Sequence, residues 1–230
     1  GNTSRAKAVI LASGGFGADL DRVAALKPAL AGFVTTNVST VTGDGIDMAV
    51  AAGAATVDMD QIQIHPSVYT ETTTALITEG IRGDGAILVN QEGKRVVNEL
   101  ETRDNVSAAE LAQEGGYAYT ILDQKMMDAS STYNGYFTKG YAVQADSYEA
   151  LAEKLGIDPA TFAATMETWN KAVADQKDDA FGRLSFASAL DTAPYYAIKV
   201  SPGIHHTMGG VKINTNTQLI DTNVNVIPGL

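Results

Sequence analysis

The sequence predicts an α+β fold in which one domain is inserted between two segments of another. Its 230 residues, 45% hydrophobic and 19% charged, are enough to bury a sizeable core. Residues 61–194 mix strand and helix patterns, whereas the flanking residues 1–60 and 195–230 are richer in strand patterns. Such bracketing suggests an inserted domain with boundaries near residues 61 and 194.

The first segment begins with an apolar run that predicts a buried strand. "AKAVILAS", from Ala6, is apolar on both faces and leads through "SGGFG" into a glycine-rich turn. Glycines let a backbone approach a bulky ligand, but the spacing is not GxGxxG, so an ordinary turn is the alternative. "TGDGIDMAVAAGA" predicts a short helix ended by Gly53. At its N-terminus, Asp44 is either a capping residue or a hydrogen-bond partner for a ribose or ribityl hydroxyl.

The middle segment alternates strands and helices. "ATVDMDQIQIHP" predicts a half-buried strand ending at His65, "GAILVNQEGKRVVNE" predicts a hairpin, and "YAYTILD" predicts a further strand. "SAAELAQEG" and "QKMMDAS" predict short helices. "DSYEALAEKLG" predicts a helix with Asp146 and Glu149 at capping-box spacing.

The longest predicted helix is "DPATFAATMETWNKAVADQ", with Asp158 as N-cap and an apolar stripe that belongs to the core. The stripe consists of Phe162, Met166, Trp169 and Val173. After Pro194 the pattern is again typical of strands: "YYAIKV", a loop "SPGIHHTMGG", and a final apolar strand "VNVIPGL".

Charge and composition exclude several kinds of partner and site. Sixteen basic against 27 acidic residues give a net charge of −11, which disfavours nucleic acid and anionic membranes. No apolar run approaches the roughly 20 residues of a membrane span. With no cysteine, the chain has no disulfide, no cysteine-based metal or iron–sulfur site and no thioether link to a haem.

Reactive side chains gather at three places along the chain. "QIHPS" carries His65, "TEGIRGDG" and "NELETRDN" carry the charged residues, and "GIHHTMGG" carries His205 and His206. Arginine presents a planar fork to a carboxylate, and histidine donates a hydrogen bond to a carboxylate or carbonyl oxygen. Two histidines with several arginines therefore favour a small polycarboxylate ligand.

Each place also has a structural interpretation. Glu79 and Arg82 have the spacing of a surface ion pair, as has Arg103 beside Asp104. His65 beside a proline could be a satisfied polar residue at a strand end. Adjacent histidines on a strand face opposite sides, and no HxH, HxxxH or carboxylate cluster lies nearby, so we expect no metal site.

Five motifs occur in an order that is specific to one family. They are "AVILASGGFG", "TGDGIDMA", "IHPS", "TEGIRGDGAILVNQEGKRVVNELETRD" and "PGIHHTMGGVKINT". With them, the sequence resembles the flavoprotein subunit of soluble fumarate reductases, within the succinate dehydrogenase/fumarate reductase flavoprotein family, from Ala6 to Leu230. The resemblance implies that residues 1–60 and 195–230 are parts of a Rossmann-like FAD-binding domain and that residues 61–194 form a capping domain that clamps substrate.

The resemblance also implies the role of individual residues. Arg103 would be the proton donor, and Glu79 and Arg82 the relay that resupplies it. Substrate would be bound by His65, Thr78 and His206, and flavin contacted by Ser13, Gly14, Gly15, Asp44 and His205. The Gly-Gly pair after the histidines would let the backbone pass close to the cofactor.

The implied reaction is FAD-dependent reduction of fumarate to succinate, with hydride from flavin N5 and a proton from the arginine. FAD would be non-covalent, the substrate a small dicarboxylate, and the electron donor a haem, FMN or quinol-linked domain or protein outside this chain. Two alternatives remain. Another enoate such as urocanate could be the substrate, although His65 favours fumarate. The 230 residues alone could be a stable, non-catalytic capping fragment that holds FAD incompletely or not at all.

Overall fold

The computed structural model describes residues 5–230, which form two compact units. Of the described residues, unit 1 comprises 5–64 and 204–230, and unit 2 comprises His65–Gly203. Residues 1–4 of the expected first segment lie outside the described part. The unit boundaries fall later than the expected residues 61 and 194, because strands β2 (Ile62–Tyr69) and β7 (Tyr195–Thr207) continue past those positions.

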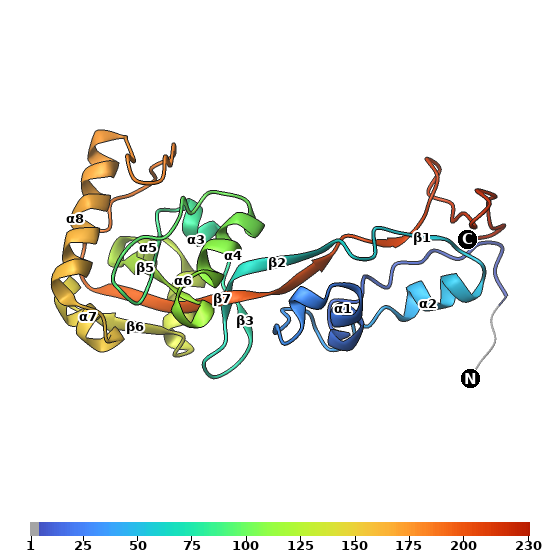
Figure 1. Ribbon diagram of the computed structural model, residues 1–230, viewed down its shortest axis with the longest axis horizontal. Helices are drawn as coiled ribbons and strands as arrows, with labels where there is room; N and C mark the ends of the chain where they lie inside the picture. The colour runs from blue at the N-terminus through green and yellow to red at the C-terminus, as the bar shows by residue number, and fades with distance from the viewer. Residues whose placement is uncertain (1–4) are drawn as a thin grey trace. The chain divides into compact units, whose positions relative to one another are not determined.

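Unit 2 is built on an antiparallel sheet with helices packed around it (Figure 1). The strand order is β3-β2-β7-β5-β4, and β6 also pairs with β7. In the central pair, β5 and β7 run antiparallel from Ala118↔Val200 to Asp123↔Tyr195. Besides β2 and β7, the strands are β3 (Ala75–Leu76), β4 (Ile87–Val89), β5 (Ala118–Asp123) and β6 (Ala142–Ala145). The helices are α3 (Gly80–Gly83), α4 (Arg103–Leu111), η2 (Glu114–Gly116), α5 (Gln124–Ala129), α6 (Ser131–Thr138), α7 (Tyr148–Leu155) and α8 (Pro159–Asp175).

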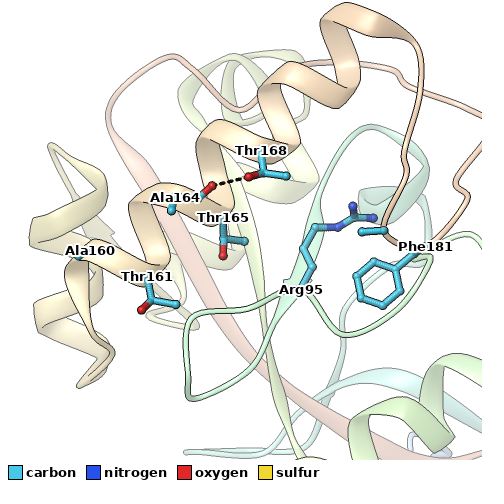
Figure 2. A pocket seen from close by; sticks show the side chains of 8 residues that line it. Arg95, Ala160, Thr161, Ala164, Thr165, Thr168 and Phe181 are labelled. Carbon is cyan, nitrogen blue, oxygen red and sulfur yellow. Dashed lines mark hydrogen bonds between the residues drawn. The ribbon is translucent and has the colours of Figure 1, made fainter.

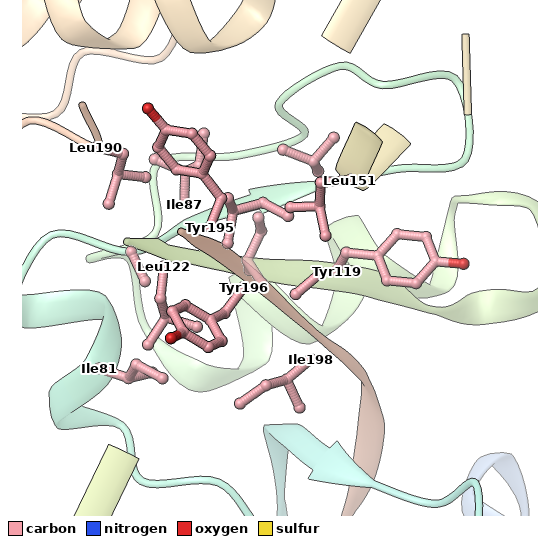
Figure 3. Close-up of a cluster of buried hydrophobic side chains, with 14 of the residues drawn as sticks. Ile81, Ile87, Tyr119, Leu122, Leu151, Leu190, Tyr195, Tyr196 and Ile198 are labelled. Carbon is pink, nitrogen blue, oxygen red and sulfur yellow. The ribbon is translucent and has the colours of Figure 1, made fainter. Parts of the chain in front are cut away.

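The core of unit 2 lies between this sheet and its helices. The side chains of Ile81, Ile87 and Leu151 have no exposed surface there, and those of Leu122 and Ile198 are each 1% exposed (Figure 3). Because each such side chain contributes about 1.5–3 kcal/mol when removed from water, this cluster is the main source of the unit's stability.

Helix α8 confirms the predicted cap and apolar stripe. Asp158 Oδ1 accepts a hydrogen bond from the Thr161 amide at 2.8 Å, and Phe162, Met166 and Trp169 have no exposed surface. Val173 is partly buried against the same cluster. Strand β5 begins one residue after the start of the predicted "YAYTILD" and ends with it at Asp123.

Unit 1 is smaller and has little sheet. Its elements are α1 (Leu20–Leu26), η1 (Pro28–Leu30), α2 (Asp44–Ala51), β1 (Thr56–Val57) and β8 (Gly210–Val211), the last two forming an antiparallel pair. Its hydrophobic core includes Phe16, Val23, Ile46, Ile62 and Ile204. The expected α+β fold class is confirmed by these elements together with those of unit 2.

The predictions of an apolar strand from Ala6 and of another in "VNVIPGL" are both wrong. The run from Ala6 forms no strand, and Val9 and Ile10 are 56% and 90% exposed. The Val9 amide donates to Gly229 O at 2.8 Å, but no strand pairs with this run to bury it within the part of the chain that the structure describes. "VNVIPGL" is likewise irregular, because turns centred on the Asn214 and Asp221 side chains break the chain into isolated bridges.

Three local predictions need correction. Helix α7 is capped by Ser147, whose hydroxyl accepts from the Ala150 amide at 3.1 Å, rather than by Asp146. The hairpin after β4 has its turn at Gly93, but its second arm forms an isolated bridge, Val89↔Arg95, in place of a strand. The expected histidine loop is part of β7.

Candidate active site

Glu79 joins two arginines into a chain of ion pairs in unit 2. Its Oε2 accepts from Arg103 Nη2 at 2.7 Å and from Arg103 Nε at 3.1 Å, while its Oε1 accepts from Arg82 Nη2 at 3.0 Å. Arg103 is the first residue of α4, and Arg82 lies in α3. The three residues that the resemblance implies as donor and relay are therefore in direct contact in the order Arg103, Glu79, Arg82.

The surface-pair interpretation is wrong for Arg82. Its side chain is 2% exposed, and Nη1 donates to Glu99 O at 2.7 Å. Burial lowers the pKa of Arg82, and the negative charge of Glu79 opposes this effect. Arg103 likewise pairs with Glu79 rather than with its exposed neighbour Asp104.

The carboxylate of Glu79 is held in its ionised form. The hydrogen bond from Arg103 lowers the pKa of Glu79, burial opposes this, and the charges of Arg103 and Arg82 lower the pKa further. Its side chain is 44% exposed, and it lines a pocket of about 380 Å³ together with Arg82, Glu99 and Glu101. Solvent can therefore reach the middle of the chain of ion pairs.

A buried ionic network that the sequence patterns did not reveal supports Arg82. Glu99, with no exposed surface, accepts from Arg95 Nη2 at 2.8 Å and from Arg183 Nη1 at 3.0 Å. Arg183 also donates to Arg82 O at 2.8 Å, which holds the end of α3. Asp178 Oδ2 accepts a hydrogen bond from Arg95 Nη2 at 3.1 Å. The unusual charge density of "GKRVVNELETRD" was the one available signal, because Arg183 lies 84 positions from Glu99.

His65 lies inside β2 rather than at a strand end as predicted, since the strand continues through Pro66 to Tyr69. It is 1% exposed, and its Nδ1 accepts from the Ser67 amide at 3.1 Å. A neutral ring that accepts at Nδ1 carries its proton at Nε2, which is the form that can donate to an anionic ligand. Thr78 is fixed through its backbone, whose amide donates to the Tyr136 hydroxyl at 2.9 Å.

The two adjacent histidines have different surroundings in unit 1. His205 Nδ1 lies 2.7 Å from Thr36 Oγ1, and its carbonyl accepts from Asn37 Nδ2 at 3.0 Å. His206 is exposed. Successive side chains of a strand point to opposite sides, and β7 contains both residues, so the predicted inequivalence of the pair is confirmed.

The residues expected at flavin come together in the remainder of unit 1. A Cβ added to Gly45 would lie 1.9 Å from Ser13 Oγ, and one added to Gly15 would lie 1.9 Å from Thr207 Oγ1. Gly14, in contrast, has a φ of +78° and nothing within 4 Å of an added Cβ. This bare backbone fits a bulky flat cofactor lying against the turn.

Asp44 is not the helix cap. Gly43 occupies the N-cap position of α2, and Asp44 Oδ1 accepts from Thr42 Oγ1 at 2.7 Å. Asp44 is exposed, and the next residue, Gly45, packs against Ser13 of the Ser13–Gly15 turn. The Asp44 carboxylate therefore remains a suitable partner for a ligand hydroxyl.

The pocket along helix α8 contains none of the predicted site residues. A pocket of about 550 Å³ lies along α8 and is lined by Arg95, Ala160, Thr161, Ala164, Thr165, Thr168, Ala180 and Phe181 (Figure 2). Within residues 5–230, no group of three or more His, Cys, Asp or Glu side chains could hold a metal ion. The helices of that same range include none with the length and apolarity to cross a bilayer.

The fold and the glycine-lined turn agree with the family to which the sequence profile assigns the chain. It belongs to the FAD binding domain family, whose profile matches residues 2–230. FAD is thus the cofactor of its family, and the chain is related to flavin-dependent oxidoreductases.

The curated relatives of the chain include a fumarate reductase and a urocanate reductase. The chain is 46% identical over 226 residues to the fumarate reductase (cytochrome) of Shewanella frigidimarina, covering 98% of this chain and 39% of that protein. It is 35% identical over 235 residues to a urocanate reductase of Eggerthella lenta, with the same two coverages, 98% and 39%. A solved structure, the open conformation of a flavocytochrome c3 fumarate reductase, matches with a TM-score of 0.79 and 41% identity over 97% of this chain and 40% of that one.

Proposed function

We propose that this chain is the substrate-protonating and flavin-contacting part of an FAD-dependent reductase that converts fumarate to succinate. The observation that carries the proposal is the continuous chain of ion pairs Arg103–Glu79–Arg82, with nitrogen–oxygen distances of 2.7 and 3.0 Å. A structural ion pair needs one arginine, whereas a proton path needs consecutive groups that can each pass a proton on. The similarity to fumarate reductases supports the same conclusion.

The proposed chemistry assigns each residue a separate task. Bound FAD in its reduced form supplies the hydride for one alkene carbon. Arg103 gives a proton to the other alkene carbon from its guanidinium and takes one back from Glu79, which is resupplied by Arg82. An arginine acid is unusual because of its high pKa in solution, and Glu79 and the buried Arg82 provide the route by which its proton is replaced.

Substrate recognition would depend on hydrogen-bond donors from histidine and threonine side chains. His65, fixed with its proton on Nε2, and His206 donate to the substrate carboxylates, and Thr78 adds a hydroxyl. Polarising a carboxylate makes the alkene electrophilic where negative charge gathers in the transition state. The ring proton of His65 is well placed for this task because Ser67 fixes the tautomer.

On the cofactor side, we assign FAD contacts to Ser13, Gly14, Gly15, Asp44 and His205. The open Cβ direction of Gly14 supports a ring or phosphate against the turn, and Thr36 fixes the His205 ring. We further propose a capping role for unit 2 and a cofactor-binding role for unit 1. The electron donor would be a haem, FMN or quinol-linked domain or protein.

The test uses the full-length protein loaded with FAD. Oxidation of a reduced viologen dye is followed with fumarate, urocanate and acrylate as acceptors in separate reactions. We expect fumarate to give the highest kcat/KM. A preference for urocanate would overturn fumarate as the substrate, and failure to oxidise the dye with any acceptor would overturn the reductase function.

The 230-residue chain can be tested by itself. It spans 39% of the length of the two relatives, and we expect it to be folded and colourless because FAD also requires segments outside it. Flavin absorbance close to one FAD per chain would contradict that expectation.

A further inference from the structure

Glu110 is a buried carboxyl group to which the proposed reaction gives no task. It lies on α4 at position i+7 from Arg103, so the two residues share one face of the helix. Its exposed fraction is 0%, and neither carboxyl oxygen has a hydrogen-bond partner among the described residues. Ser107, one turn before it, is also buried with an unpartnered hydroxyl. Buried polar groups without partners are rare in proteins, and each requires an explanation.

Arg82 is the charged group that acts on Glu110. The Arg82 nitrogens Nη1 and Nη2 are used by Glu99 O and Glu79, whereas its Nε is buried without a partner within residues 5–230. Glu110 therefore acts on Arg82 through space and without a hydrogen bond. From η2, which packs against α4, the titratable side chain is Glu114, and it is exposed.

Burial favours the neutral form of Glu110. Loss of water raises the pKa of Glu110 well above its usual range, and the positive charge of Arg82 opposes this effect only in part. Glu79 differs from Glu110 in exposure and in hydrogen bonding, because it is partly exposed and accepts hydrogen bonds from two arginines. Arg82 thus has an ionised carboxylate as its hydrogen-bonded partner and a carboxylic acid as a second neighbour.

We propose that Glu110 is a positioning residue of the relay: a neutral acid that leaves Glu79 as the hydrogen-bonded counter-charge of Arg82 and so lets Arg82 release its proton toward Glu79. When Glu110 ionises, its negative charge adds to those of Glu79 and Glu99 around Arg82, so the guanidinium proton is held more tightly and the resupply of Arg103 slows. This inference rests on the proposed function, since it assigns Glu110 a role in the same proton path.

The test compares pH profiles of kcat and KM for fumarate in the FAD-loaded, full-length protein. The variants are Glu110→Gln, which keeps the side chain neutral at every pH, and Glu114→Gln as an exposed control on η2. We expect the Glu110→Gln variant to match wild type at the acid end and to exceed it at the alkaline end, up to about tenfold for each pH unit beyond the wild-type transition. KM should not change, and the Glu114→Gln variant should follow wild type.

Denaturant unfolding over the same pH range gives a readout that does not depend on activity. The unfolded chain releases the Glu110 proton at the ordinary pKa of a glutamate, whereas the folded protein keeps it to higher pH. The stability contribution of this group is therefore complete below the unfolded pKa and lost as pH rises through the folded pKa. Wild type should lose stability relative to the Glu110→Gln variant over that interval.

The results distinguish failure of the proposed role of Glu110 from failure of the proposed reductase function. An active wild type whose Glu110→Gln variant has the same profile, a uniform loss of kcat at all pH values, or a raised KM overturns the role of Glu110 alone. A stability difference that does not change with pH overturns the buried neutral acid. A wild type that fails to reduce fumarate overturns the proposed function and, with it, the relay role.

Discussion

Arg103 reaches both oxygens of Glu79, with Nη2 2.7 Å from Oε2 and Nε 3.3 Å from Oε1. The same carboxylate also accepts from Arg82, so one glutamate bridges an arginine at the start of α4 and a buried arginine in α3. This bridge makes Glu79 the group on which the proposed proton path depends.

Replacing Glu79 with Gln should interrupt that path while keeping the side chain's shape. The amide cannot exchange a proton between the two arginines, so we expect kcat to fall by about 100-fold, as for loss of a general acid–base group, with little change in KM. Steady-state kinetics with fumarate measures both constants. A variant with wild-type kcat would show that Glu79 is not in the proton path.

Replacing Glu99 with Gln should destabilise the fold. The change leaves Arg95 and Arg183 buried with less compensating charge, and breaking a buried pair costs about 3–5 kcal/mol. Denaturant unfolding measures the change. The matched control is Glu92→Gln, an exposed partner of Lys94, for which we expect no measurable change. Equal stability of the two variants would contradict a structural role for the Glu99 network.

Asp178 gives this network a defined pH dependence. Burial alone would raise the pKa of Asp178, but hydrogen bonds from Arg95 and from backbone amides lower it overall. A lowered folded pKa contributes stability above the unfolded pKa, and that stability is lost as pH falls through the folded value. The stability difference between wild type and the Asp178→Asn variant should therefore shrink in acid. A difference that grows in acid would contradict the assignment.

The two glycines after the histidines should differ in their tolerance of alanine. A Cβ on Gly209 would lie 2.1 Å from Asp58 O and 2.6 Å from Met59 Cα, whereas one on Gly210 meets nothing within 4 Å. Overpacking against backbone costs about 1–3 kcal/mol, so Gly209→Ala should destabilise the chain and Gly210→Ala should not. Thermal unfolding of both variants tests this. Similar melting temperatures for the two would show that Gly209 is not required by the Asp58–Met59 backbone.

Local patterns predicted the elements that depend on local physics. Asp158 and Pro159 fixed the start of α8, and the spacing of Phe162, Met166 and Trp169 identified its buried face, because capping and helical periodicity act within one segment. The prediction of a strand from Ala6 was wrong because a strand needs a neighbouring strand, which the residues of this run cannot themselves provide.

The site was predictable in part for the same reason. Glu79 and Arg82 are three positions apart, so their contact follows from a single turn, whereas the contact with Arg103 required the family's motif order. The support of Arg82 by Arg183 joins residues 101 positions apart and could not be inferred from a local pattern. Burial of Glu110 was equally invisible, since its neighbours in sequence are those of an ordinary amphipathic helix.

The central claim is that Arg103 donates the proton that completes fumarate reduction. The most direct measurement is fumarate-dependent oxidation of a reduced viologen dye by the full-length, FAD-loaded Arg103→Gln variant, with its FAD content confirmed by absorbance. We expect this variant to bind FAD and to have lost its activity. Full activity in the Arg103→Gln variant would contradict Arg103 as the acid.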